Sequence, residues 1–196
     1  MPRTYDARSL EARWSRRWDE DGCYRAPELP VRPKFYNFDS GPFPNGPLHL
    51  GHVRTYVLGD VTARFQRARG KDVLYCLEWD AFGLPNERAA RAERISPAEF
   101  TARWIRSMED QLRTLGVSYD WTRVRNTSDP SYYKWTQWLF LRMHAWGLVS
   151  FRRVRGPYCP ECRTVLAQMQ VVDDTCWRCH TPVIARQLGQ WIVDLG

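Results

Sequence analysis

A strand, a loop rich in glycine and proline, a helix and a second strand follow one another early in this sequence. Residues 34–39 are rich in aromatic side chains and predict a short strand. Residues 49–68 have a helical pattern, and residues 72–79 predict another strand. A helix between two neighbouring strands forms a right-handed crossover, and this crossover makes the two strands parallel. We therefore predict an α/β fold with a parallel sheet covered by helices.

The rest of the chain divides around this unit. Further helices are expected over residues 6–21, 96–115 and 130–146, and extended chain from residue 151 onward and over residues 183–194. We predict three segments: an N-terminal helix with a proline-containing linker at 1–33, a nucleotide-binding half-domain at 34–150, and a small metal-binding module at 151–196.

Two histidines mark the start of the helix that follows the first loop. His49 and His52 lie three residues apart, so they share one helix face in the first turn. A helix N-terminus attracts phosphate, and both imidazoles can donate hydrogen bonds to phosphate oxygens. Gly51 between them allows a flat group to approach the backbone. Two alternatives are a buried helix start with satisfied histidines and a zinc site. The zinc site ranks low because no third ligand lies nearby in the sequence.

A carboxylate follows the second predicted strand. Ligands of open parallel sheets bind beyond the carboxyl ends of the strands, and Asp80 lies there. This side chain can pair with the ammonium group of an amino acid. A helix cap after Pro85 or a salt bridge to an arginine explains it equally well from the sequence alone.

Four cysteines occur as two close pairs, Cys159 with Cys162 and Cys176 with Cys179. Four thiolates at this spacing suit tetrahedral Zn²⁺, and a site closed by four protein ligands is structural. Two disulfides are the alternative, but the chain has no apolar signal segment that would indicate export. His180 could also replace Cys179 as a ligand, although the symmetry of the pairs argues against it.

These motifs resemble the class I aminoacyl-tRNA synthetases, and among them the leucyl-tRNA synthetases. His49-Leu50-Gly51-His52 is similar to their His-Ile-Gly-His signature, and Trp79-Asp80-Ala81-Phe82-Gly83-Leu84-Pro85 is similar to a second motif of the leucyl enzymes. The four-cysteine module resembles their zinc insertion. Ser40 and Gly41 depart from the residue pairs that the family usually has beside its amino-acid pocket.

The resemblance implies a role for each matching residue. The ATP-binding residues would be Pro42, Gly46, His49, Gly51 and His52. The two histidines would be catalytic, because they would stabilise the phosphates of ATP during adenylate formation. The substrate-binding residues would be Phe43, Asp80 and Phe82, with Asp80 on the α-amino group. The implied fold is the first half of a Rossmann-like sheet. The implied ligands and partners are ATP with Mg²⁺, leucine, tRNA(Leu) and a structural Zn²⁺.

The composition agrees with such partners. The formal net charge is +7, which suits nucleic acid or nucleotide phosphates, although the arginines are spread along the chain. Apolar stretches are short, so we expect no membrane span and a cytoplasmic location.

The sequence lacks the lysine loop that the family uses to grip ATP, and it lacks an editing domain. Three hypotheses remain: a portion of a leucyl-tRNA synthetase, a split enzyme completed by a second chain, or a stand-alone paralogue that binds or activates an amino acid. The rival from another class is a catalytically inactive module that binds tRNA or a partner.

Overall fold

The computed structural model describes residues 5–194, so the ends of the predicted segments 1–33 and 151–196 lie outside the described residues. The chain forms two compact units, which meet in sequence between Tyr133 and Lys134. The helices are α1 (Ala7–Glu20), α2 (Leu50–Ala68), α3 (Leu84–Glu93), α4 (Pro97–Leu115) and α5 (Pro130–Ala145). The strands are β1 (Lys34–Asn37), β2 (Asp72–Tyr75), β3 (Glu78–Trp79), β4 (Arg125–Asn126), β5 (Val149–Cys159), β6 (Thr164–Val165), β7 (Val171–Val172), β8 (Thr175–Cys176) and β9 (Ile184–Val193). None of the helices in this described part is long and apolar enough to cross a membrane.

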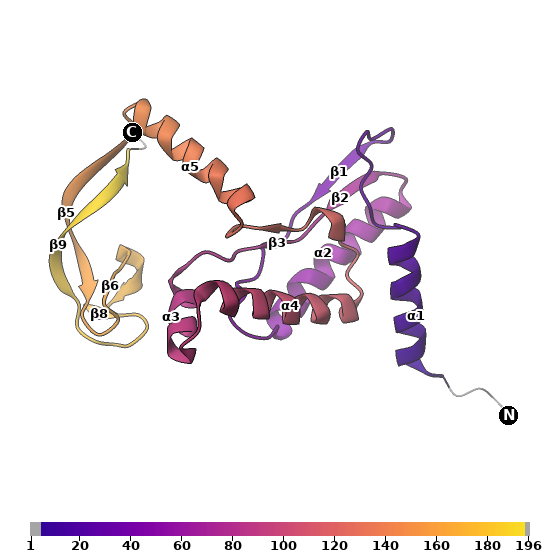
Figure 1. The fold of residues 1–196 in the computed structure, drawn as a ribbon, viewed down its shortest axis with the longest axis horizontal. Helices are drawn as coiled ribbons and strands as arrows, with labels where there is room; N and C mark the ends of the chain where they lie inside the picture. The colour runs from indigo at the N-terminus through magenta and orange to yellow at the C-terminus, as the bar shows by residue number, and fades with distance from the viewer. Residues whose placement is uncertain (1–4, 195–196) are drawn as a thin grey trace. The chain divides into compact units, whose positions relative to one another are not determined.

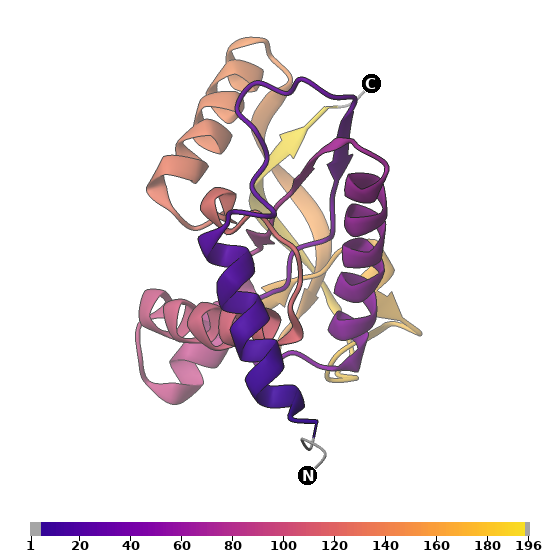
Figure 2. The same cartoon turned by 90° about the vertical axis from the view of Figure 1, so that its right-hand side faces the viewer.

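The predicted crossover is present in unit 1. β1 and β2 pair in parallel, with Lys34 opposite Asp72 and Asn37 opposite Tyr75. α2 connects the two strands and runs alongside them (Figure 2). It ends before Gly70, whose φ of 77° lies in the left-handed region that favours glycine. The predicted α/β class is therefore confirmed.

The second predicted strand, residues 72–79, is not continuous. It divides into β2 and β3, and β3 pairs in parallel with β4. The segment that follows α4 runs beside both pieces, because Asp120, Arg125 and Thr127 donate backbone hydrogen bonds to the carbonyls of residues 75, 77 and 79. A long-range neighbour of this kind leaves no local pattern in the sequence, so the break was not predicted.

The core of unit 1 lies on the α2 side of these strands. Alternate residues from Val73 to Trp79 point toward it and are buried. α4 contributes Met108 and Leu112, each at most 1% exposed. The predicted start of this helix is confirmed, because the Ser96 hydroxyl accepts a hydrogen bond from the Glu99 backbone at 3.1 Å.

Two shorter features complete unit 1. α1 begins after Asp6, as predicted, and contacts α4. α3 was not predicted as a helix. It starts after Gly83, whose φ is 148°, and carries Pro85 in its first turn, where proline is tolerated.

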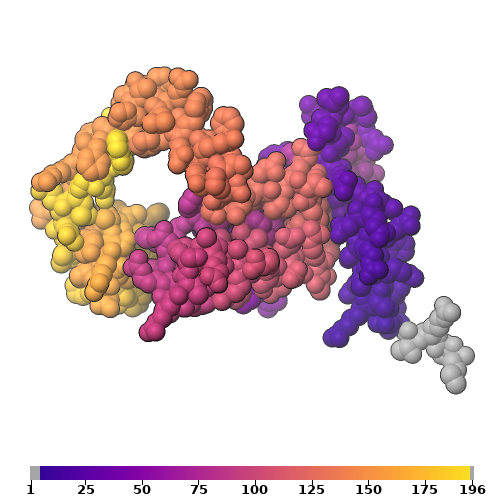
Figure 3. All heavy atoms as spheres, in the orientation of Figure 1, coloured from indigo at the N-terminus to yellow at the C-terminus, as the bar shows by residue number. Residues whose placement is uncertain are grey.

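Unit 2 consists of a long antiparallel ribbon with the larger part of α5, from Lys134 onward, at one end and the cysteine module at the other (Figures 1 and 3). β5 pairs with β9 from Val149 opposite Val193 to Tyr158 opposite Ile184. The predicted helix over residues 130–146 and the extended chain over 183–194 are confirmed.

Candidate functional site

The loop of residues 40–47 is held tightly against the end of β3. A Cβ atom at Gly41 would lie 1.7 Å from the carbonyl oxygen of Glu78, so only glycine fits at this position. The next residue, Pro42, accepts a hydrogen bond through its carbonyl from the backbone N–H of Asp80 at 3.3 Å. The end of β1 and the end of β3 are therefore locked together through the loop.

The remainder of the loop is fixed from the other side. Asn86 in α3 is 3% exposed, and its side-chain amide donates to the carbonyls of Pro44 and Ala81, each at 3.4 Å. The backbone N–H of Leu48 donates to Gln111 of α4 at 2.9 Å. These bonds set the direction in which the chain enters α2.

His49 and His52 lie at the first turn of α2, and the imidazole of each accepts a hydrogen bond from the backbone N–H of the other. Nδ1 of His49 accepts the backbone N–H of Gly51 at 3.1 Å and that of His52 at 3.4 Å, while Nδ1 of His52 accepts the backbone N–H of His49 at 3.2 Å. The two rings stack with their centroids 3.8 Å apart. A Cβ atom at Gly51 would lie 2.9 Å from the His49 ring, so this glycine makes room for the imidazole.

This arrangement fixes the chemistry of both rings. Each Nδ1 accepts a hydrogen bond, so in the neutral form each proton sits on Nε2 and is available as a donor. Partial burial lowers the pKa of His52, and the neighbouring His49 lowers it further. The helix start therefore offers two Nε2–H donors together with the positive end of its dipole, which suits a bound anion.

Asp80 directly follows β3 with its backbone fixed on both sides. The N–H of the next residue, Ala81, donates to the Thr127 hydroxyl at 2.8 Å. The neighbouring acid Glu78 accepts a hydrogen bond from Tyr132 at 2.9 Å. The Asp80 carboxylate accepts no hydrogen bond from the described residues, so it can take a positively charged ligand group.

The other candidate residues lie in the same loops. Phe43 is 50% exposed and Phe82 is 55% exposed. Phe82 packs against Tyr133 at 5.6 Å between ring centroids, but it makes no ring contact with Phe43 within the described chain. A Cβ atom at Gly46 would meet open space, unlike one at Gly41.

One partly buried acid was missed in the sequence. Asp39, two residues beyond β1, accepts hydrogen bonds from the hydroxyls of Tyr75 and Tyr119. Burial raises the pKa of Asp39, although both tyrosines oppose this effect. A Cβ atom at Gly59 would come within 2.4 Å of this carboxyl group, so α2 packs closely on it. An acid at the end of a strand, together with a glycine inside the facing helix, was the available signal.

The four predicted cysteines converge in unit 2. Their sulfur atoms all lie within 4.8 Å of one another, and two of the residues, Cys159 and Cys176, are fully buried. Each pair is followed by a residue in the left-handed region, Arg163 or His180, so the two turns have similar geometry. His180 does not belong to the cluster found within residues 5–194.

The cluster fits a tetrahedral zinc ion. Zn–S bonds of about 2.3 Å place tetrahedral sulfur atoms about 3.8 Å apart. The Cys179 sulfur lies 3.4 Å from that of Cys159 and 3.6 Å from that of Cys162. Hydrogen bonds from Thr181 lower the pKa of Cys179 to about 6, which favours the thiolate that a metal needs.

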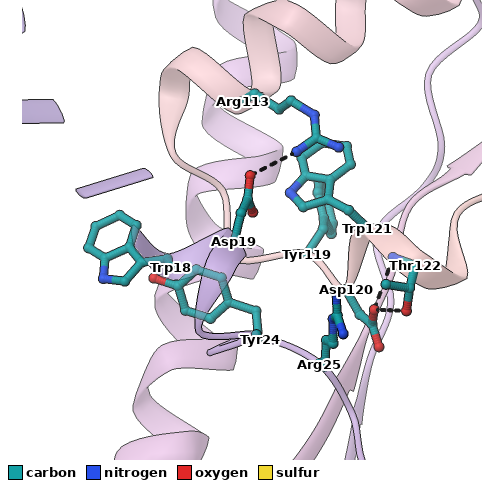
Figure 4. Close-up of a pocket in the computed structure, with 10 residues that line it drawn as sticks. Trp18, Asp19, Tyr24, Arg25, Arg113, Tyr119, Asp120, Trp121 and Thr122 are labelled. Carbon is teal, nitrogen blue, oxygen red and sulfur yellow. Dashed lines mark hydrogen bonds and ion pairs between the residues drawn. The ribbon is translucent and has the colours of Figure 1, made fainter. Parts of the chain in front are cut away.

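A cavity of about 310 Å³ lies elsewhere in unit 1, between the end of α1 and the end of α4 (Figure 4). It contains none of the predicted site residues. Its charges are largely paired within the protein: Arg113 binds Asp19 at 3.2 Å, and the buried Asp120 accepts hydrogen bonds from Thr122 and Ala26. We interpret it as a surface hollow beside a structural network of hydrogen bonds and ion pairs.

Comparison with known proteins relates this geometry to one family. The sequence model described as "tRNA synthetases class I (M)" matches residues 40–187. The leucine–tRNA ligase subunit alpha of Aquifex aeolicus is 43% identical over 195 residues, which cover 100% of this chain and 31% of that protein. A leucine–tRNA ligase of Nitratidesulfovibrio vulgaris is 45% identical over 191 residues, which cover 97% of this chain and 23% of that protein.

Solved structures give the same result. The LeuRS–tRNA–LeuAMS complex of Agrobacterium radiobacter matches with a TM-score of 0.91 and 40% identity, covering 97% of this chain and 24% of that chain. The methionyl-tRNA synthetase of Mycobacterium tuberculosis with methionyl-adenylate matches with a TM-score of 0.67 and 25% identity, covering 81% and 32%. This chain spans less than a third of the length of each of these four proteins.

Proposed function

The chain belongs to the class I tRNA synthetases, and from that premise we propose that it forms the ATP-binding and amino-acid-binding half of a leucine–tRNA ligase. One observation carries the proposal. The loop of residues 40–47 ties the backbone at Asp80 to the helix start that carries His49 and His52, because the backbone N–H of Asp80 donates to the Pro42 carbonyl. An ammonium-binding group and a phosphate-binding group are thus held in one rigid frame.

In the proposed reaction, a carboxylate oxygen of leucine attacks the α-phosphorus of ATP. The bond from this phosphorus to the bridging oxygen of the β-phosphate breaks, and pyrophosphate leaves. His49 and His52 donate from Nε2 to phosphate oxygens, where negative charge grows in the transition state. Gly51, Gly46 and Pro42 let the nucleotide approach the backbone. Mg²⁺ accompanies the nucleotide and would neutralise its phosphates.

We propose that Asp80 pairs with the ammonium group of leucine, and that Phe43 and Phe82 line the apolar part of the pocket. Their exposure supports this, because about half of the surface of each residue is accessible. The close approach of the Glu78 backbone explains why position 41 is a glycine. Its departure from the family pattern therefore does not argue against leucine. The acyl group would then pass to the terminal adenosine of tRNA(Leu).

By role, we propose the division that the sequence predicts: an N-terminal helix and linker at 1–33, a nucleotide-binding half-domain at 34–150, and a zinc module with the start of an insertion at 151–196. Zn²⁺ on the four cysteines would be structural, since all four positions are taken by protein. A cytoplasmic location accords with tRNA as a partner.

We propose that the rest of the site comes from polypeptide that also covers the exposed face of the β1–β2 sheet. Tyr36 and Phe38 on this face are each 61% exposed, and apolar sheet faces of α/β folds are normally covered. This covering polypeptide is either another part of the same protein or a second chain. One relative is itself named as a subunit, which is compatible with a second chain.

Binding of a sulfamoyl analogue of leucyl-adenylate tests the proposal without any need for turnover. Calorimetry should show that Asp80→Asn lowers affinity for the leucyl analogue by about tenfold or more, the value of a hydrogen bond to a charged group. The matched control is the same analogue without its α-amino group, for which wild type and Asp80→Asn should bind alike. Equal loss for both analogues, or no binding by the wild type, would overturn the assignment.

A further inference from the structure

The two faces of the β5–β9 ribbon differ in whether their arginines have interaction partners within the protein. Directly opposed residues of an antiparallel pair share a face, and side chains alternate along each strand. The pairs of Phe151 with Trp191, Arg153 with Gly189 and Arg155 with Gln187 therefore lie on one side. We call this side, defined by Phe151, Arg153, Arg155, Gln187 and Trp191, the ribbon platform.

The arginines of the opposite face are engaged within the protein. Nε of Arg152 donates to the Ser150 hydroxyl at 2.7 Å, and its guanidinium lies 3.9 Å from the Asp194 carboxylate. Arg186 stacks over the ring of Tyr158 at 4.8 Å. Both guanidinium groups already have partners within the protein, so they are less available to bind an anion than unpaired arginines would be.

The arginines of the ribbon platform are exposed, and neither Arg153 nor Arg155 has an ion pair within residues 5–194. No acidic residue occupies a position on this face, from residue 151 to 157 or at their opposed positions 185 to 191. The platform therefore presents two positive charges without local neutralisation, and charge complementarity points to a polyanion.

Two aromatic rings accompany these charges. Phe151 is 61% exposed and Trp191 is 51% exposed, and their ring centroids are 5.4 Å apart. Phe140 and His144 of α5 contact the Trp191 ring edge-on at 5.1 and 5.7 Å, which fixes its orientation. The ring of Phe151 lies over Gly189, where a Cβ atom would come within 2.6 Å of it.

We propose that the ribbon platform binds unpaired RNA. Exposed aromatic rings that stack on bases, beside arginines that contact phosphates, form the usual surface for single-stranded nucleic acid. Duplex RNA keeps its bases stacked inside the helix, so the rings could not reach them. The proposed function enters this inference only in identifying the RNA, which would be an unpaired segment of tRNA.

Fluorescence anisotropy of a labelled single-stranded hexaribonucleotide, titrated with the zinc-loaded chain over a range of salt concentrations, tests this. The double variant Arg153→Ser/Arg155→Ser should lose about tenfold in affinity and lower the salt slope by about 1.4, since each single-strand phosphate contact contributes about 0.7. The matched control Arg152→Ser/Arg186→Ser, on the opposite face, should stay within twofold of wild type. Equal losses in the two double variants would overturn the proposal.

The aromatic part is tested separately. Trp191→Leu and Phe151→Leu should each lower affinity by about fivefold or more without changing the salt slope, because stacking involves no counterion release. Circular dichroism and zinc content identify a variant that has unfolded, and the other variant then decides. A duplex that competes as well as the single strand would overturn the preference for unpaired RNA. His49→Gln/His52→Gln should bind the hexanucleotide normally, so failure of the activation site is a distinct result.

Discussion

Substitution of Gly41 by alanine tests the link between the loop and β3. The new Cβ atom would start 1.7 Å from the carbonyl oxygen of Glu78. Real contacts of this kind are not shorter than about 3 Å, so the backbone must separate by roughly 1.3 Å. The hydrogen bond from Asp80 to Pro42, already 3.3 Å long, would not survive this movement.

The expected loss of stability follows from these two effects. Overpacking costs about 1–3 kcal/mol, and the lost backbone hydrogen bond costs about 1 kcal/mol, so the free energy of unfolding of unit 1 should fall by about 2–4 kcal/mol. The movement also displaces Asp80. A misplacement of about 1 Å in a reacting group can cost roughly 100-fold in rate, so activation should fall further than stability implies.

Urea unfolding followed by circular dichroism measures the first effect. The matched control is Gly46→Ala, in the same loop, where the Cβ atom meets open space and stability should change by less than about 0.5 kcal/mol. A Gly41→Ala protein as stable as Gly46→Ala would refute the close approach on which the site depends.

Three further predictions follow from other residues. Cys176→Ser should lose bound zinc, measured by atomic emission, while unit 1 unfolds at the wild-type urea concentration; full zinc content would contradict the four-thiolate site. Burial raises the pKa of Asp39, so its neutral form favours folding, and this contribution is lost as pH rises through the raised pKa. Asp39→Asn cannot ionise, so the stability of this variant relative to wild type, measured by urea unfolding, should be greater at pH 7 than at pH 4. The same relative stability at both pH values would count against a desolvated Asp39 carboxyl. NMR titration should give His52 a pKa below about 6.5 with the proton on Nε2 in the neutral form, because burial and His49 disfavour its charge; a proton on Nδ1 would contradict the cap geometry.

Local signals in the sequence identified the elements that depend on neighbouring residues. The start of α2 at His49, the start of α4 at Ser96 and the two cysteine pairs each depend on residues within a few positions, and the structure has them as expected. The helical crossover followed from the order of these elements.

Features that depend on distant residues were not predictable in this way. The break at residues 76–77 results from pairing with the segment after α4, more than 40 positions away. Asp39 gains its role only from Tyr75 and Tyr119, which the fold brings to the end of β1. α3 was missed because its N-terminal glycine and proline resemble a loop when read alone.

Amino-acid-dependent exchange of pyrophosphate into ATP tests the central claim most directly. We would use a chimera in which this chain replaces the matching segment of a leucine–tRNA ligase, so that the other half of the site is present. The account predicts exchange with leucine in preference to isoleucine, valine and methionine, abolished by Asp80→Ala. Exchange that persists in Asp80→Ala, or that follows another amino acid, would contradict it.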